Sequence, residues 1–337
     1  MSQPMTGTPE TILSISGLSL DFETYDGTLR VLDGIDMDVR RGETIGIVGE
    51  TGCGKSVLAK SVLNLLPLSA ARYRSGTIRW KGENLLGKAT KHLRKVRGTE
   101  IGMVFQDPMT FLDPLYTAGS YLLEAIGHRD QVKGANSSGA LRRAEAIDLL
   151  GRLGLAEPER VFHSYPHQLS GGMRQRVLIA AAIAGNPELL IADEPTTALD
   201  VTVQAQILHL LKGFVESRRT SIMLISHDLG VIASTCERIA VMYAGTVVET
   251  GTKTQLLSRP AHPYTMGLIA AVPRLGYPQT QVKGIVGQIP NLLAPPPGCR
   301  FAPRCSKATS LCRQEKPLSV RLEDGRQVAC HHPEPVQ

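Results

Sequence analysis

The sequence TIGIVGETGCGKS, residues 44–56, contains the strongest fold signal in this chain. Residues 44–48 form a continuous apolar run that predicts a buried strand, and residues 55–66 have the pattern of a helix. The loop between them matches G-x-x-x-x-G-K-[ST] in the strand–loop–helix context that this pattern requires. Glycines let the backbone N–H groups face phosphates, and the helix start adds positive potential. The stretch therefore predicts a nucleotide site formed by Gly49, Glu50, Thr51, Gly52, Cys53, Gly54, Lys55 and Ser56.

We expect a different role for each of three side chains of this loop. Lys55 can reach the β- and γ-phosphates of a nucleotide, and the hydroxyl of Ser56 can ligate Mg²⁺. Cys53 is interpreted as a small residue that fills the loop, with a redox-sensitive thiol as the alternative.

A second apolar strand ends in two acids, in the sequence LLIADE at residues 189–194. Parallel sheets bind ligands at the carboxyl ends of their strands. We expect Asp193 to hold Mg²⁺, directly or through water, and Glu194 to act as the general base for an attacking water.

The remainder of the sequence up to position 258 predicts an α/β domain, because apolar strands alternate with helical periodicity. Segments 12–20 and 29–39 are expected to be antiparallel strands, and no strand is expected between residues 107 and 187, which indicates an inserted helical subdomain. Within it, the polar stretch 128–139 is expected to be an exposed loop. Further strands are expected at 100–105 and 221–226, and further helices at 140–153, 172–184 and 201–215.

The sequence LSGGMRQR at residues 169–176 resembles the signature motif of ABC-type ATPases. Gln106 matches the Q-loop of that family, ALD at 198–200 its D-loop, and ISHD at 225–228 its switch-histidine motif. Met173 departs from the pattern, since much of the superfamily has Gln there. The resemblance implies a RecA-like core, an antiparallel β subdomain and an inserted helical subdomain at about 107–187.

The same resemblance implies a composite ATP site between two subunits. Ser170 is a good helix N-cap, and Gly171 and Gly172 leave N–H groups uncovered at the start of a helix whose dipole favours an anion. In the family these donors meet the γ-phosphate of ATP held by a partner ATPase subunit. The remaining expected roles are catalysis and Mg²⁺ coordination by Gln106, and catalysis by His227, which contacts the γ-phosphate and helps to position water. Asp200 is expected to contact nucleotide, and Tyr25 or, alternatively, Phe22 is expected to stack on adenine.

The C-terminal part of the chain, positions 259–337, differs in composition from the rest. It contains ten basic and four acidic residues, 12 of the 21 prolines and four of the six cysteines, whereas residues 1–258 hold equal numbers of acids and bases. This shift predicts a domain boundary near residue 258. The longest apolar run has eight residues, short of the roughly 18 that a membrane span needs. The N-terminal sequence shows no secretory signal, so we expect a cytosolic protein.

The four C-terminal cysteines are spaced C-x5-C-x6-C-x17-C and suggest ligation in a small irregular module. Structural zinc sites usually contain a close C-x2–4-C pair, which is missing here. The candidates are a [4Fe–4S] cluster, zinc or free thiols, and the cysteines are Cys299, Cys305, Cys312 and Cys330. The sequence RPAHPYT at 259–265 and the cysteines resemble the C-terminal extension of dipeptide/oligopeptide permease ATP-binding subunits, some of which carry such a cluster. The basic excess would offset cluster charge or face anionic lipid.

Two functions of different classes are consistent with these features. The first is the ATP-hydrolysing subunit of an importer for dipeptides, oligopeptides or related cargo such as haem. It would sit peripherally on the cytoplasmic face of the inner membrane, with a second ATPase subunit, two membrane permeases and, indirectly, an external substrate-binding protein. The alternative is a soluble ABC ATPase that acts on nucleic acid through a zinc-bearing tail. The balanced charge of residues 1–258 disfavours nucleic acid as a partner.

Overall fold

The computed structural model describes residues 10–67, 69–197, 200–218, 220–272 and 284–335. Its main sheet has eight strands in the order β11-β12-β10-β9-β3-β8-β7-β6. The strands from β9 to β6 are parallel, and β10, β12 and β11 add antiparallel pairs at one edge. The strand bounds are β3 Thr44–Val48, β6 Ile101–Val104, β7 Leu189–Asp193, β8 Ser221–Ser226, β9 Arg238–Tyr243, β10 Thr246–Thr252, β11 Val320–Arg321 and β12 Gln327–Val328.

The central strands are buried on both faces, because every residue of β3, β6, β7 and β8 is buried. Their continuous apolar sequences are typical of a parallel sheet covered on both sides. The strands expected at 44–48, 100–105, 189–192 and 221–226 are confirmed, with small differences at their ends.

A second, antiparallel sheet packs beside the first, in the order β2-β1-β4-β5. Its first two strands pair as expected for segments 12–20 and 29–39, with Leu20 opposite Leu32. The strand bounds are β1 Thr11–Thr24, β2 Gly27–Arg40, β4 Ala71–Trp80 and β5 Glu83–Asn84.

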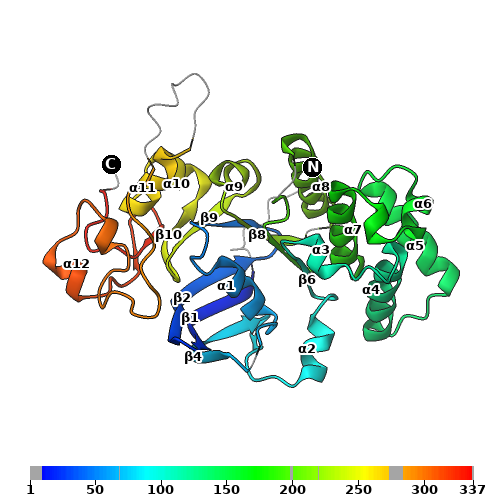
Figure 1. Cartoon of the computed structure of the whole chain (residues 1–337), viewed down its shortest axis with the longest axis horizontal. Coiled ribbons are helices and arrows are strands. Elements are labelled where there is room, and N and C mark those ends of the chain that lie inside the picture. Colours follow the sequence, from blue (N-terminus) through cyan, green and yellow to red (C-terminus); the bar gives the residue numbers. More distant parts are fainter. Residues whose placement is uncertain (1–9, 68, 198–199, 219, 273–283, 336–337) are drawn as a thin grey trace.

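Some helices lie around the sheets, and the others form a separate group at one end of the molecule (Figure 1). That group follows β6 and precedes β7, and it consists of α3 Pro108–Phe111, α4 Ala118–Lys133, α5 Gly139–Arg152, α6 Pro158–His163, the 3-10 turn η1 Pro166–Gln168 and α7 Gly171–Ala184. The remaining helices before the C-terminal segment are α1 Lys55–Val62, α2 Thr90–Val96, α8 Val201–Arg218, α9 Leu229–Thr235 and α10 Lys253–Ser258. The expected absence of strands between residues 107 and 187, all of which the structure describes, is confirmed.

The prediction of an exposed loop at 128–139 is wrong for the first half of that stretch. Helix α4 continues to Lys133 and is capped by Gly134, whose φ is +67°. The polar residues there are helical because Asp130 points inward and is almost fully buried. Its carboxylate accepts hydrogen bonds from the guanidinium groups of Arg129 and Arg142, at 2.8 Å and 3.0 Å. A buried charge needs such partners, and only the packing of α5 against α4 supplies Arg142.

The C-terminal segment continues the main sheet. Glu249 and Thr250 of β10 pair with Val328 and Gln327 of β12. Its other described elements are α11 Pro263–Ala270, the 3-10 turn η3 Ala302–Arg304 and α12 Ser310–Gln314. Figure 1 shows this segment at the end of the molecule opposite the helical group. The boundary near residue 258 stays a prediction, but the segment shares a sheet with the part of the chain that precedes it.

Candidate functional site

The loop at residues 49–54 joins the central strand β3 to helix α1. Gly52 and Gly54 have φ values of +84° and +101°, in the left-handed region that favours glycine. Gly49 has no room for a side chain, because a Cβ there would lie 2.1 Å from the carbonyl oxygen of Met242. The loop backbone therefore requires glycine at three of its six positions, as a loop that presents N–H groups to an anion does.

Lys55 is buried beneath this loop. Its ammonium nitrogen Nζ donates to the carbonyl oxygens of Gly49 at 2.8 Å and Glu50 at 3.1 Å. A buried cation held by neutral carbonyls fits a site that accepts an anion. Cys53 is also fully buried, and burial raises the pKa of its thiol, which supports the interpretation as a loop filler.

Ser56 and Asp193 meet at the ends of α1 and β7. The Ser56 hydroxyl donates to Asp193 Oδ1 over 2.9 Å. Burial raises the pKa of Asp193, an effect that the Ser56 hydrogen bond partly offsets. A hydroxyl beside a buried carboxylate is a donor set that suits Mg²⁺, because this ion prefers oxygen ligands.

Three side chains converge on one oxygen of Glu194, which directly follows β7. Glu194 Oε2 lies 3.1 Å from Gln106 Nε2, 3.1 Å from His227 Nδ1 and 2.9 Å from the hydroxyl of Thr197. Glu194 itself has φ of +46°, an uncommon backbone conformation for a residue other than glycine. Because Gln106, Glu194 and His227 follow the adjacent strands β6, β7 and β8, the parallel sheet brings together three residues that are 88 and 33 positions apart in sequence.

The signature residues lie apart from this loop in the described part of the chain, with no hydrogen bond between the two. Ser170 caps α7, since its hydroxyl accepts the N–H of Met173 at 3.3 Å, and Ser170 and Gly171 are exposed. Asp200 caps α8 in the same way, by accepting the N–H of Val203. The other two D-loop residues, 198 and 199, lie outside the described residues.

The two candidates for adenine stacking differ in exposure. Tyr25 stands at the tip of the β1–β2 hairpin and is fully exposed. Phe22 is half-buried and packs against the core beneath the antiparallel sheet. The exposed ring of Tyr25 is free to stack on a planar partner.

The four C-terminal cysteines line one cavity. Its other walls include Phe301, Ala302 and the imidazoles of His262, His331 and His332. All four thiols are free, and burial raises the pKa of Cys299 and also that of Cys330, to about 11. Over the described ranges, no three or more His, Cys, Asp or Glu side chains are grouped closely enough to hold a metal ion. The cysteines therefore share a cavity, but their present arrangement is not that of a preformed metal site.

Sequence reasoning missed the contacts between the C-terminal segment and the phosphate loop. The Arg304 guanidinium binds the Glu50 carboxylate, and the Tyr264 hydroxyl accepts the Glu50 N–H. Tyr264 belongs to the HPYT sequence, whose His262 is buried, so that the pKa of this imidazole is lowered to about 3. No local pattern could have revealed these contacts, since the partners are 214 and 254 positions apart.

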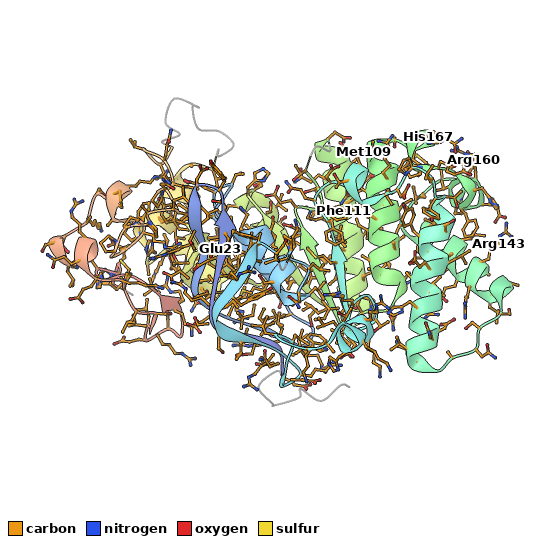
Figure 2. The ribbon with its side chains drawn as sticks, turned by 60° about the horizontal axis from the view of Figure 1, so that its bottom comes forward. Glu23, Met109, Phe111, Arg143, Arg160 and His167 are labelled. Atoms are coloured by element: carbon orange, nitrogen blue, oxygen red, sulfur yellow. The ribbon has the colours of Figure 1, made fainter. Side chains whose placement is uncertain are left out.

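An exposed apolar patch lies close to Gln106. It comprises Met109, Phe111, Leu115 and Tyr116, all of which are exposed. Figure 2 labels Met109 and Phe111, which belong to α3, the first helix of the helical group. Phe111 also stacks on Phe105, the residue that precedes Gln106, with 3.9 Å between ring centroids. No helix among the described residues has the length and apolarity to cross a membrane.

The fold and the arrangement at the strand ends define an ATP-binding cassette. The family model for ABC transporters matches residues 32–197, and that for the C-terminal region of oligopeptide/dipeptide transporters matches residues 248–312. The solved dimeric ABC transporter cassette MJ0796 is 29% identical, with a TM-score of 0.64 over 72% of this chain and 98% of that one.

Similar proteins with assigned functions show to which kind of ATP-binding cassette the chain is related. The chain is 46% identical to a probable peptide ABC transporter ATP-binding protein, y4tR, of Sinorhizobium fredii, and 44% identical to the dipeptide transport ATP-binding protein DppD of Bacillus subtilis. Each match covers 95% of this chain and 94% of the relative. The chain therefore belongs to the ATP-binding proteins of ABC-type peptide transporters.

Proposed function

We propose that the chain binds and hydrolyses ATP to power the import of dipeptides or oligopeptides through a membrane permease. The strongest support is the convergence of Gln106, Thr197 and His227 on Glu194, next to the Ser56–Asp193 pair. The names of the relatives support the peptide cargo, and related small cargo such as haem is the alternative.

The phosphate loop would hold the triphosphate of ATP. The N–H groups of residues 49–56 would face the phosphates, and Lys55 would exchange its two carbonyl partners for phosphate oxygens. Ser56, Asp193 and Gln106 would hold Mg²⁺, which neutralises phosphate charge when bound.

Glu194 would accept the proton of the attacking water. Three partners on one oxygen hold this carboxylate in a single orientation, so its other oxygen stays available as a base. His227 is more exposed than Glu194 and would contact the γ-phosphate while its Nδ1 stays beside the glutamate.

Each ATP site would be completed by a second ATPase subunit. Ser170, Gly171 and Gly172 present their N–H groups at an uncovered helix start, and Asp200 lies exposed at the start of α8. The dimeric state of the related cassette MJ0796 supports this arrangement. Tyr25 would stack on adenine, with Phe22 as the alternative.

The exposed apolar patch would contact the permeases. Met109, Phe111, Leu115 and Tyr116 are all exposed and form an apolar surface of the kind that marks protein interaction sites. Because Phe111 stacks on Phe105 next to Gln106, a partner on this patch would be mechanically connected to the catalytic glutamate. We infer two permeases, an external substrate-binding protein and a peripheral position on the cytoplasmic face of the membrane.

The cysteine cavity would hold a [4Fe–4S] cluster if the four thiols drew closer together than they lie in the structure, where the described residues form no metal-binding group. Cys299, Cys305, Cys312 and Cys330 line it, and four thiolates are the ligands that such a cluster uses. A structural role fits, since small irregular segments need a covalent or metal staple. Zinc and free thiols are the alternatives that metal analysis distinguishes.

The substitution Glu194→Gln tests the hydrolysis mechanism. An amide cannot accept a proton, so we expect turnover to fall at least about 100-fold while ATP affinity stays within about threefold. The measurements are phosphate release and ATP titration on the same preparation. Equal loss of binding and turnover would contradict the role of Glu194 as general base.

A further inference from the structure

The C-terminal extension, described at residues 259–272 and 284–335, holds the first turn of the phosphate loop at one residue, Glu50. The Arg304 guanidinium donates from Nη1 to Glu50 Oε2 at 2.7 Å and from Nη2 to Glu50 Oε1 at 3.1 Å. This is a two-point contact in which both the distance and the orientation of the carboxylate are specified. Only 5% of the Arg304 side chain is exposed, so water competes little for the pair.

Arg304 is itself held rigidly. Its Nε donates to the carbonyl oxygen of Val286, and Nη2 also donates to that of Ile285, both at 3.0 Å. Nη1 also lies 3.4 Å from the hydroxyl of Tyr243. Counted with the two bonds to Glu50, each of the five N–H groups of the guanidinium has an acceptor. The Glu50 carboxylate is therefore held against a fixed group.

The backbone of Glu50 is held by a second residue of the extension. Its N–H donates to the hydroxyl of Tyr264 at 3.0 Å. The Tyr264 ring is fully buried and packs against Tyr243 and Phe301, with centroids 4.6 Å and 5.3 Å away. The side chain and the backbone of Glu50 are thus positioned by residues 254 and 214 positions away in the sequence.

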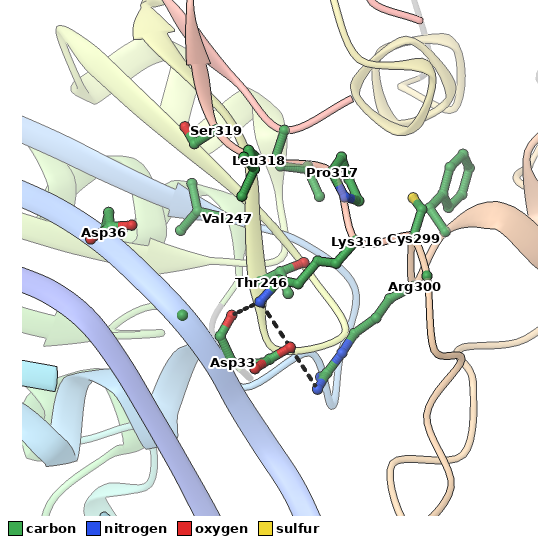
Figure 3. A pocket seen from close by; sticks show the side chains of 15 residues that line it. Asp33, Asp36, Thr246, Val247, Cys299, Arg300, Lys316, Pro317, Leu318 and Ser319 are labelled. Carbon is green, nitrogen blue, oxygen red and sulfur yellow. Dashed lines mark hydrogen bonds and ion pairs between the residues drawn. The ribbon is translucent and has the colours of Figure 1, made fainter. Parts of the chain in front are cut away.

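The Arg304 contact comes from the loop that contains two of the cavity cysteines, whereas Tyr264 lies on α11. Arg304 directly precedes Cys305, and Arg300 directly follows Cys299. Arg300 is buried, pairs with Asp33 at 3.4 Å and donates to the carbonyl oxygen of Ala244. Figure 3 shows Arg300 and Lys316 meeting at Asp33 in the cavity between the extension and the sheet.

The turn that Arg300 binds also touches the phosphate loop, since the Gly245 N–H donates to the carbonyl oxygen of Cys53 at 2.8 Å. Both arginines of the Cys299–Cys305 loop therefore reach the phosphate loop. Arg304 does so directly, and Arg300 does so through the turn at residues 244–245.

We propose that Arg304 and Tyr264 are positioning residues through which the C-terminal extension sets the conformation of the phosphate loop and thereby the affinity for ATP. The loop must hold several N–H groups at once toward the phosphates, so fixing its first turn in advance removes an ordering cost from binding. The arrangement makes nucleotide binding sensitive to the conformation of the cysteine loop. This proposal rests on the proposed function in that ATP binds at residues 49–56.

The test is a double-mutant cycle in the full chain with Arg304→Gln and Glu50→Gln. Each single change should raise the Kd for ATP about tenfold, and the double change should raise it no further, because both remove one contact. In Arg304→Gln the KM for ATP should rise with the Kd while kcat at saturating ATP stays within about twofold, since Arg304 lies outside the loop that would bind the phosphates. Arg304→Lys should fall between wild type and Arg304→Gln, because lysine keeps the charge and loses the fork.

Two comparisons keep the result interpretable. Arg313→Gln, at an exposed position of α12 in the same extension, should leave the Kd unchanged. Glu50 is about a quarter exposed, so Glu50→Gln reports on the contact even where Arg304→Gln lowers the yield of folded protein.

The inference is overturned if wild type binds ATP and both single variants have the same Kd for ATP as wild type. It is also overturned if the increases in binding free energy from the two single changes add in the double variant. A wild-type chain that fails to bind ATP overturns the proposed function itself, which is a separate result.

Discussion

The strand-end edge proposed to bind nucleotide and the C-terminal extension hold their polar side chains in different ways. At the edge, Ser56, Gln106, Asp193, Glu194 and His227 each lie at the end of a buried parallel strand or begin the helix after one. The sheet alone brings them together, over hydrogen bonds of 2.9–3.1 Å. The extension has short elements only, and its side chains are held by ion pairs to distant residues. A regular sheet needs few such pairs, whereas an irregular segment depends on each of them.

The ion pair between Glu249 and Arg326 is the deepest of these anchors. Both side chains are almost completely buried, and Nη1 of Arg326 lies 3.4 Å from Glu249 Oε1. The same carboxylate accepts the N–H groups of Ala261 and His262 at 2.8 Å and 3.0 Å, immediately before α11. One buried acid thus joins β10 to both ends of the extension.

Glu249→Gln should give the largest change in free energy of the substitutions considered. It tests whether the C-terminal extension and the rest of the chain unfold separately. It leaves a buried guanidinium without this partner, so we expect the free energy of unfolding to fall by about 3 kcal/mol. The measurement is urea unfolding followed by the fluorescence of Trp80, which lies in β4 of the antiparallel sheet and far from this pair in sequence. An unshifted Trp80 transition would mean that the extension unfolds independently of the cassette.

The matched control for this change is Glu323→Gln, which removes the same carboxylate at an exposed position of the extension. Surface substitutions away from caps and ion pairs have small effects, so the free energy of unfolding should stay close to the wild-type value. Equal losses in the two variants would show that the burial of Glu249 is not the cause.

Lys55→Ala tests the strand-end edge that is proposed to bind nucleotide, and it should give the next largest change in free energy. The substitution removes the buried ammonium that opposes phosphate charge, so the Kd for ATP should rise about 100-fold, equivalent to about 2.7 kcal/mol. Titration of the full chain with ATP measures it, and Lys95→Ala at an exposed position of α2 controls for the loss of one charge. An unchanged Kd would contradict the assignment of the phosphate loop.

The cysteine cavity should give the smallest effect on ATP binding. Anaerobically purified protein should contain iron and show broad visible absorption, and Cys312→Ser should lose both. Cys312 lies on α12 and is not part of the Arg304–Glu50 ion pair, so we expect the Kd for ATP to rise by less than it does in Arg304→Gln. Colourless protein with stoichiometric zinc would exclude the cluster, and metal-free protein would favour free thiols.

The parts of the fold that could be predicted are those with local signals. The strands β3, β6, β7 and β8 are short apolar runs, and α5 and α7 have helical periodicity and capping residues. The helical end of α4 could not be predicted, because the burial of Asp130 depends on Arg142 from another helix. The pairing of β12 with β10 escaped prediction for a related reason, since a two-residue strand has too short a pattern to recognise.

The amino-acid sequence by itself determined the phosphate loop, the acids at the end of β7 and the family. These are encoded by residue types at fixed, short spacings, where glycine, lysine and carboxylate have restricted chemical uses. Only the tertiary structure decided that Thr197 joins Gln106 and His227 on one oxygen of Glu194, and that Arg304 and Tyr264 hold Glu50. The partners in the Arg304 ion pair are 254 positions apart. No spacing along the chain specifies such a contact, because it exists only once the extension packs on the sheet and excludes water from the pair.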